Sequence, residues 1–327
     1  MRRREFLTVL GGLVATCPRA AHAQQRAVPV IGFLSTRSAT EADYVTAPFR
    51  QGLKEAGYVE SQNMAIEFRW AEFQYDRLPG FAADFVQRRV AVIAAVGGIH
   101  SGLAAKRATS TIPIVFVSAG DPVSFGLVPS LSRHGSNVTG ISMITVALAP
   151  KRLELLHELV PTAVVIAMLA NPTSPYFEPE TRDVLDAARK LGLQVHVLEA
   201  KTERDLDGAF ATLGQKRATA LLVSGDPFFD SQRDKLVALA ARRAVPAIYQ
   251  WREFADLGGL VSYGSSITNA YREAGLYAGR ILKGERPADL PIVQPTRLEL
   301  VINLKTAKAL GLTIPQSILV RADQVIQ

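Results

Sequence analysis

Short apolar runs rich in β-branched residues recur along this chain, and segments with helical periodicity separate them. In the first half the runs lie at 28–35, 64–70, 90–96, 113–118 and 138–142. The segment 78–86 carries apolar residues at spacings of 0, 3, 4, 7 and 8, which is the stripe of a helix packed on a sheet. Strand-length runs that alternate with such helices are typical of βα units. The pattern therefore predicts an α/β fold with a largely parallel sheet.

The second half repeats this architecture without repeating the sequence. Its apolar runs lie at 163–170, 193–198, 220–224, 245–249 and 260–263. One short segment is similar in both halves, Val117–Pro122 and Val223–Pro227, and each copy follows a predicted strand. A chain of 327 residues is long enough for two domains of ordinary size. We expect two doubly wound, Rossmann-like parallel-sheet domains.

The last 60 residues do not form a third repeat. They read as a helix at 269–283, a proline-spaced stretch, a strand at 297–303 and a helix at 304–310. Such a tail is expected to return to both domains, with chain crossings near residues 143, 264 and 296. Several crossings make a hinge. The predicted lobes are 24–143 plus 265–295 and 144–264 plus 296–327, facing each other across a cleft walled by the carboxyl ends of the strands.

Residues 1–23 have the pattern of an export signal. Arg2, Arg3 and Arg4 precede an apolar core at 6–15, and Ala21-His22-Ala23 suits signal peptidase. The pair Arg3-Arg4 is similar to a twin-arginine signal, and the general secretory route remains the alternative. Cleavage at Cys17, as in a lipoprotein, is a weaker alternative. The prediction is a periplasmic protein that begins at Gln24.

Removing this segment changes the charge and cysteine content. The net charge falls from +7 to +4, because the segment holds four arginines and one glutamate. A surplus this small, with no run of five basic residues, gives no reason to expect nucleic-acid binding. The only cysteine is Cys17, so the remaining chain cannot form a disulfide or a cysteine-ligated metal site. No apolar run after residue 23 approaches the length of a membrane span.

Several common catalytic patterns are missing from the sequence. There is no G-x-G, no G-x-x-x-x-G-K-[ST] and no G-x-S-x-G, which argues against dinucleotide, nucleotide and common hydrolase sites. The histidines His100, His134, His157 and His196 are well separated. We therefore expect neither catalysis nor a metal or other cofactor.

Candidate ligand contacts are the small, polar and aromatic residues at predicted strand ends. Glycines and hydroxyls there let backbone NH groups meet a carboxylate, an aspartate suits an ammonium group, and aromatic rings suit an apolar side chain. Each type also has an ordinary structural explanation, since Asp-Pro forms turns and buried tyrosines pack. The candidates are Ser35, Thr36, Gly97, Gly98, Ser118 and Asp121 in the first half and Asn171, Ser224, Asp226, Tyr249, Trp251 and Tyr263 in the second.

Seven segments together resemble a known family. They are 76–79 (DRLP), 112–116 (IPIVF), 120–123 (GDPV), 151–156 (KRLELL), 246–249 (PAIY), 258–264 (GGLVSYG) and 300–312 (LVINLKTAKALGL). In this order they resemble the ABC transporter substrate-binding proteins that include the tryptophan- and tyrosine-binding proteins, over residues 28–325. The resemblance implies a type I periplasmic-binding-protein fold with three hinge crossings, no catalysis, and delivery of a small solute to a membrane permease and its ATPase. We expect a monomer.

The resulting hypothesis is a binding protein for an aromatic or apolar amino acid or a related small carboxylate. A sensor that presents its ligand to a membrane receptor is an alternative that the sequence does not separate from transport. An exported α/β enzyme is a further alternative, since fold alone does not decide function. A sugar-responsive repressor would carry a helix-turn-helix where this chain has its signal-like segment.

Overall fold

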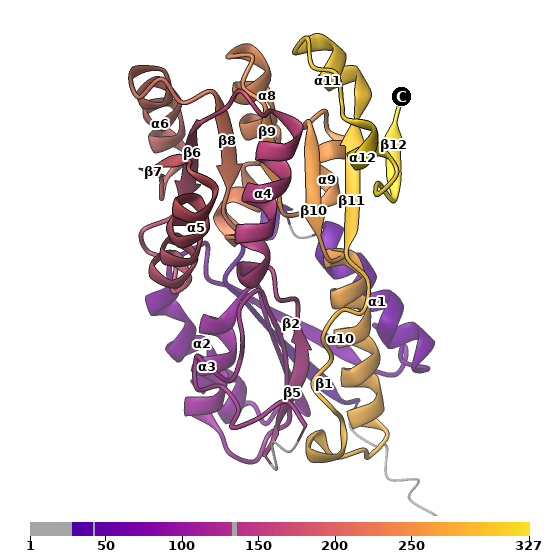
Figure 1. The fold of residues 1–327 in the computed structure, drawn as a ribbon. Helices are drawn as coiled ribbons and strands as arrows, with labels where there is room; N and C mark the ends of the chain where they lie inside the picture. The colour runs from indigo at the N-terminus through magenta and orange to yellow at the C-terminus, as the bar shows by residue number, and fades with distance from the viewer. Residues whose placement is uncertain (1–27, 42, 133–135) are drawn as a thin grey trace, which may run out of the picture.

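The computed structural model describes residues 28–41, 43–132 and 136–327, so the predicted signal segment lies outside the described residues. The first lobe is built on a five-stranded parallel sheet in the order β2-β1-β3-β4-β5. The strands are β1 (Val30–Ser35), β2 (Ala65–Trp70), β3 (Val92–Val96), β4 (Ile114–Ser118) and β5 (Val138–Ser142). Helices α2 (Leu78–Gln87) and α3 (Ile99–Ala108) lie on one side of this sheet, and α1 (Asp43–Glu55) lies on the other (Figure 1).

The second lobe has a seven-stranded sheet in the order β12-β11-β10-β9-β8-β6-β7. Its strands are β6 (Val165–Ala170), β7 (Gln194–Glu199), β8 (Ala220–Val223), β9 (Ala247–Tyr249), β10 (Val261–Gly264), β11 (Glu299–Asn303) and β12 (Gln324–Ile326). All neighbours pair in parallel except β10 and β11, which are antiparallel. The helices are α4 (Ala149–Leu159), α5 (Phe177–Leu191), α6 (Glu203–Gln215), α7 (Pro227–Ser231), α8 (Arg233–Arg242), α9 (Arg252–Asp256), α11 (Leu304–Ala309) and α12 (Gln316–Leu319).

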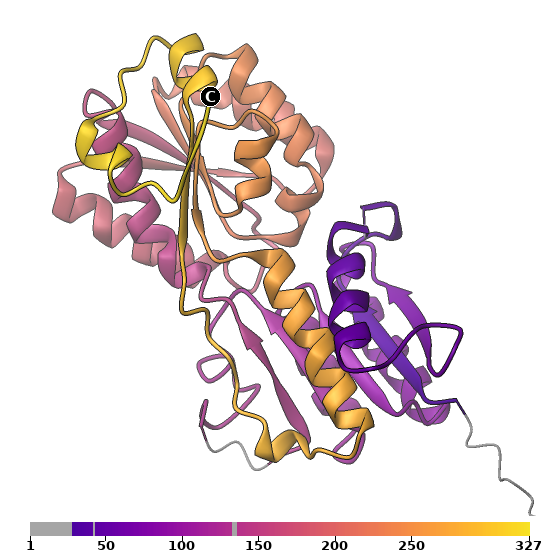
Figure 2. The same ribbon diagram turned by 90° about the vertical axis from the view of Figure 1, so that its right-hand side faces the viewer.

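The chain passes between the sheets in three places. It leaves β5 for α4, leaves β10 for α10 (Ile267–Leu282), and returns to β11 after residue 293 (Figure 2). The crossing segments are bonded to one another, since Ser142 N donates to Val293 O at 2.9 Å and Ser265 Oγ donates to Met143 O at 3.3 Å. We call these three segments the hinge.

Helix α10 follows the second lobe in sequence but packs in the first, beside α1. Glycines allow the two helix backbones to touch. A Cβ at Gly52 would lie 1.9 Å from Arg272 O, and one at Gly275 would lie 2.0 Å from Phe49 O. Any larger residue at either position would force the helices apart.

The fold class predicted from the sequence is confirmed, as two lobes with parallel sheets. Each of the eleven predicted strands matches an observed strand, with ends that differ by at most two residues. The strand β12 was not predicted. Its three residues are partly exposed and carry no alternating pattern, so only pairing with β11 defines it as a strand. In the described part of the chain, no helix has the length and apolar character needed to span a bilayer.

Candidate functional site: an inter-lobe cavity

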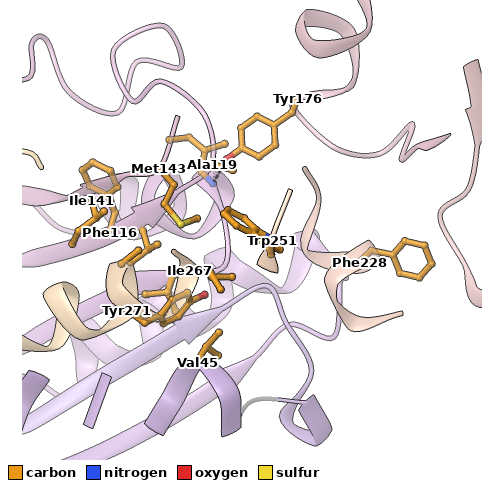
Figure 3. Close-up of a cluster of buried hydrophobic side chains, with 14 of the residues drawn as sticks. Val45, Phe116, Ala119, Ile141, Met143, Tyr176, Phe228, Trp251, Ile267 and Tyr271 are labelled. Atoms are coloured by element: carbon orange, nitrogen blue, oxygen red, sulfur yellow. Dashed lines mark hydrogen bonds between the residues drawn. The ribbon is translucent and has the colours of Figure 1, made fainter. Parts of the chain in front are cut away.

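A small cavity lies between the two lobes at the carboxyl ends of their strands. The first lobe and α10 contribute Arg37, Gly97, Gly98, Val117, Ala119 and Tyr271, and the second lobe contributes Gly225, Asp226, Pro227, Asp230 and Trp251. Met143, on the hinge, completes the wall (Figure 3). The cavity volume is about 20 Å³, which is room for roughly one water molecule. The lobes are therefore closed upon each other, and we call this space the inter-lobe cavity.

Arg37 joins the first lobe to the second through an ion pair. Its Nη2 lies 2.7 Å from Asp230 Oδ2, and both side chains are only 4% exposed. Within the first lobe and α10, Arg37 also donates to the Tyr44 hydroxyl at 2.5 Å and the Tyr271 hydroxyl at 3.3 Å. Burial opposes the charge of Arg37, but these partners outweigh it and raise its pKa above the usual value. The guanidinium is thus charged and held in place.

Asp230 is bound from its own lobe as well. Its Oδ1 accepts hydrogen bonds from Gln250 Nε2 and from Trp251 Nε1, each at 2.7 Å. Gln250 and Trp251 follow β9, so the carboxylate fixes this strand end against the neighbouring lobe. We call Arg37, Asp230, Gln250 and Trp251 the inter-lobe network.

Tyr176 makes a second connection between the lobes. Its ring belongs to the second lobe, between β6 and α5, and its hydroxyl accepts a hydrogen bond from Ile99 N at 2.9 Å. The same hydroxyl lies 3.1 Å from Ser118 Oγ in the first lobe. Burial raises the pKa of Tyr176 to about 12, so the hydroxyl remains protonated near neutrality. This contact closes the cleft beside Gly98, whose φ of 128° allows the chain to turn into α3.

Asp226 lines the cavity and has one buried carboxylate oxygen without a well-placed donor among the described residues. Its side chain begins α7 as an N-cap, with Oδ1 accepting from Phe228 N at 2.9 Å and from Asn171 Nδ2 at 3.1 Å. Its Oδ2 is buried and makes no hydrogen bond of good geometry among the described residues. Burial raises the pKa of Asp226, and the nearby Asn171 and Ser174 side chains only partly offset this rise. A buried carboxylate oxygen without a donor is costly, so this atom is suited to receive a donor from a ligand.

A second buried ion pair lies behind Asp226, inside the second lobe. Arg152 Nη2 is 3.2 Å from Glu180 Oε1, with exposures of 0% and 2%. Arg152 also donates to Thr145 O in the hinge at 3.1 Å, and Glu180 Oε1 accepts from Gly225 N at 3.2 Å. Burial raises the pKa of Glu180 to about 7 and lowers the pKa of Arg152. The pair therefore connects the hinge to the loop that carries Asp226.

Four of the twelve residues predicted from the sequence line the cavity, namely Gly97, Gly98, Asp226 and Trp251. Four others hydrogen-bond to residues of the site: Ser35 accepts from Arg37 N, Thr36 donates to Gly97 O, Ser118 contacts Tyr176, and Asn171 donates to Asp226. These eight residues form one region across both lobes.

The other four predicted residues do not line the cavity. Asp121 is exposed, and its Oδ1 accepts from Val123 N at 3.0 Å in a local turn. Tyr249 is 1% exposed and stacks on Phe254 in the core, with ring centroids 4.6 Å apart. Ser224 is buried behind the loop that carries Asp226, and Tyr263 packs at the edge of the core of the second lobe. These four residues thus lie in a turn or in the packed core, and the buried Tyr249 hydroxyl has no hydrogen bond among the described residues.

The sequence did not reveal Arg37, Tyr176, Asp230 or Tyr271 as site residues. Arg37 directly follows the predicted strand end at Thr36, which is a usable signal, since an arginine there faces the cleft. Asp230 and Tyr271 lie on helices whose patterns indicate only packing. No group of three or more histidine, cysteine, aspartate or glutamate side chains suited to a metal ion occurs within the described ranges.

The ABC transporter substrate binding protein family model matches residues 27–326, which is nearly the whole chain. The chain belongs to this family. The tyrosine-binding protein of Clostridioides difficile is 28% identical over 264 residues, covering 81% of this substrate-binding protein and 75% of that one.

Two solved structures allow a comparison of lobe arrangement. An ABC domain from Streptococcus pneumonia in complex with L-Trp has a TM-score of 0.78 at 25% identity, covering 90% of this chain and 100% of that one. The ligand-free, open structure of a Clostridium difficile substrate-binding protein has a TM-score of 0.64, also at 25% identity, covering 92% and 100%. The present structure is thus more similar to the complex than to the open protein.

Proposed function

We propose that this chain is the extracytoplasmic solute-binding component of an ABC importer and captures an aromatic or apolar amino acid between its lobes. It acts as a monomer and delivers the solute to a permease and its ATPase. The observation that carries the proposal is the buried Asp226 carboxyl, which has no cation partner among the described residues, on the wall of a cavity that both lobes line. A solute that touches both walls stabilises the closed form by its higher affinity for that form. The related tyrosine-binding protein and the complex with L-Trp support an aromatic side chain.

The charges around the cavity favour a solute with an ammonium group. Arg37 is balanced by Asp230, and Arg152 is balanced by Glu180. Asp226 has no ion-pair partner among the described residues, and burial raises its pKa, so its carboxylate lacks a cation to balance it when ionised. An ammonium group on Asp226 Oδ2 would balance it. A solute carboxylate does not need an unpaired cation of its own, because it can accept hydrogen bonds from the remaining Arg37 donors or from backbone NH groups near Gly98.

This difference makes the amine more important than the carboxylate. Without the amine, Asp226 remains buried without a cation while the solute adds a carboxylate. Without the carboxylate, Arg37 keeps its ion pair with Asp230. Of the ligands expected from the sequence, an amino acid therefore fits the site better than a simple carboxylate.

The test is calorimetric titration of the protein with L-tryptophan, with tryptamine, which lacks the carboxylate, and with indole-3-propionate, which lacks the amine. We expect tryptamine to bind within about tenfold of L-tryptophan and indole-3-propionate to bind at least ~100-fold more weakly, as for a broken buried ion pair.

The matched variants are Asp226→Asn and Asp121→Asn, because both aspartates precede a proline at a strand end but only Asp226 faces the cavity. Asp226→Asn should lose ~100-fold in affinity for L-tryptophan, and Asp121→Asn should bind as the wild type does. Equal losses in the two variants, or binding of indole-3-propionate as tight as that of L-tryptophan, would contradict the assignment of Asp226. Absence of binding by every aromatic amino acid would contradict the proposed solute.

A further inference from the structure

A second cavity lies behind the inter-lobe cavity, on the hinge. All three crossing segments contribute to its wall, together with the first turns of α10. Its volume is about 310 Å³, at the lower end of the range for small-molecule sites. Ile141, Ala270, Val293 and Pro295 give it an apolar lining, and Glu273 and Glu299 lie on the same wall. We call this space the hinge cavity.

Met143 is common to the walls of both cavities. In Figure 3 it lies between Ile141, which lines the hinge cavity, and Trp251, which lines the inter-lobe cavity. Its backbone is fixed, because Met143 N donates to Ser118 O at 2.8 Å and Met143 O accepts from Ser265 Oγ. Its side chain is unbranched and has three rotatable bonds, so it can change rotamer without moving the backbone. The walls of the two spaces therefore share one flexible side chain.

The closed inter-lobe cavity is too small for an aromatic side chain, at about 20 Å³. Room can be gained by separating the lobes, which would break the Arg37–Asp230 ion pair and the Tyr176 contact with Ile99. A rotamer change of Met143 would also gain room, because it would join the inter-lobe cavity to the hinge cavity and leave both inter-lobe contacts in place. The second route costs less, because a buried ion pair is expensive to break and a methionine rotamer is not.

We propose that Met143 determines which solutes this protein accepts, by acting as a movable partition through which an apolar side chain extends into the hinge cavity. This inference rests on the proposed function, since Asp226 holds the amine of the solute at the other end. The substrate class is an amine-bearing solute with a large apolar side chain, of two fused or linked rings. Because the hinge cavity touches all three crossing segments, the side chain also holds the lobes at their closed angle.

The test compares L-tryptophan with 4-phenyl-L-phenylalanine, whose side chain is longer, by calorimetry on three proteins. The wild type gives the reference ratio of dissociation constants. Met143→Ala should shift that ratio about tenfold towards the longer side chain, because more apolar surface is then buried. The third protein is Met143→Ala/Thr296→Phe. Thr296 is exposed and lines the hinge cavity, and a phenylalanine ring at this position should fill that cavity. The second change should return the ratio to the wild-type value.

A ratio that Met143→Ala does not change would overturn the proposal. A changed ratio that Thr296→Phe does not reverse would overturn it too, because the added room would then lie in the inter-lobe cavity alone. If no amino acid binds the wild type, the proposed solute fails but the partition can still be tested with indole. The chain has four methionines, and only Met64, Met143 and Met168 follow the signal-like segment, so methyl-labelled methionine spectra are simple.

Indole should then shift the Met143 methyl signal and not those of Met64 and Met168, which are buried in the sheets of the two lobes. The shift should disappear in Thr296→Phe. A Met143 signal that does not move, or that moves equally in Thr296→Phe, would contradict access to the hinge cavity.

Discussion

Two buried arginine–carboxylate pairs lie near the cavity, and they differ in what they connect. Arg37 and Asp230 come from opposite lobes, whereas Arg152 and Glu180 both belong to the second lobe. Separating the lobes would break the first pair and leave the second intact. The first pair therefore stabilises the closed arrangement of the lobes, and the second stabilises the folded second lobe.

The two pairs also differ in how well burial is compensated. Asp230 accepts hydrogen bonds from Arg37, Gln250 and Trp251, so its charge is well satisfied. Among the described residues Glu180 accepts from Arg152 and one backbone NH, and burial raises its pKa to about 7. Ion pairing inside a protein repays desolvation only when enough donors surround the carboxylate. The structure thus has a buried pair with a well hydrogen-bonded carboxylate where the lobes meet, and a poorly compensated pair inside one lobe.

The largest effect is expected when the pair inside the lobe is broken. Arg152→Met should lower the free energy of unfolding by about 3–5 kcal/mol at pH 8, because Glu180 is left buried without its cation. Urea denaturation measures the change. The control is Lys151→Met at the next residue, whose ion pair with Glu154 is exposed and should not affect stability measurably. Equal stability of the two variants would contradict the structural role of Arg152.

A pH-dependent effect of Glu180 follows from its raised pKa. Between its usual pKa and about 7, folded Glu180 binds more protons than unfolded Glu180, so its contribution to stability is present at low pH and is lost as the pH rises. Glu180→Gln removes this titration. Between pH 5 and 8, the stability of wild type should therefore fall relative to Glu180→Gln, at up to about 1.4 kcal/mol per pH unit. A difference between the two proteins that is constant with pH would contradict the raised pKa.

A smaller effect on stability is expected from the pair between the lobes. Asp230→Asn should lower the free energy of unfolding by about 1–2 kcal/mol, since the amide still accepts from Gln250 or Trp251. Its main effect should be on lobe separation, because Arg37 loses its anion in the opposite lobe. Small-angle scattering should show a larger radius of gyration than for the wild type. An unchanged radius together with a large loss of stability would mean that Asp230 serves folding and not closure.

Most of the fold could be predicted from the sequence because its elements are defined locally. Strands such as β3 (Val92–Val96) are fully buried apolar runs, and α2 carries a continuous apolar stripe. The strand β12 could not be predicted, because its three residues depend on pairing with β11. The close packing of α1 on α10 could not be predicted from the sequence either. Gly52 and Gly275 are ordinary glycines in the sequence, and only the fold brings each against the backbone of the other helix.

The site was predictable only where strand ends define it. Gly97, Gly98 and Trp251 were predicted in this way, and they line the inter-lobe cavity. Asp121 and Asp226 both stand in a Gly-Asp-Pro sequence after a strand, but Asp226 begins a helix that faces the other lobe, and Asp121 forms an exposed turn. Arg37 and Asp230 are 193 residues apart, so no local pattern indicates that they pair. Contacts between the lobes depend on how the two folded lobes are placed relative to each other. The periodicity and residue spacing of the sequence carry no information about that placement.

Closure of the lobes on a solute can be tested most directly by a distance measurement between them. The chain after its signal-like segment has no cysteine, so Gln87→Cys in the first lobe and Lys216→Cys in the second, both at exposed positions, give two unique dye sites. Single-molecule energy transfer should show two distances for Asp230→Asn without solute, and L-tryptophan should shift the population to the shorter one. A distance distribution that L-tryptophan leaves unchanged, in a protein that binds it, would contradict capture between the lobes.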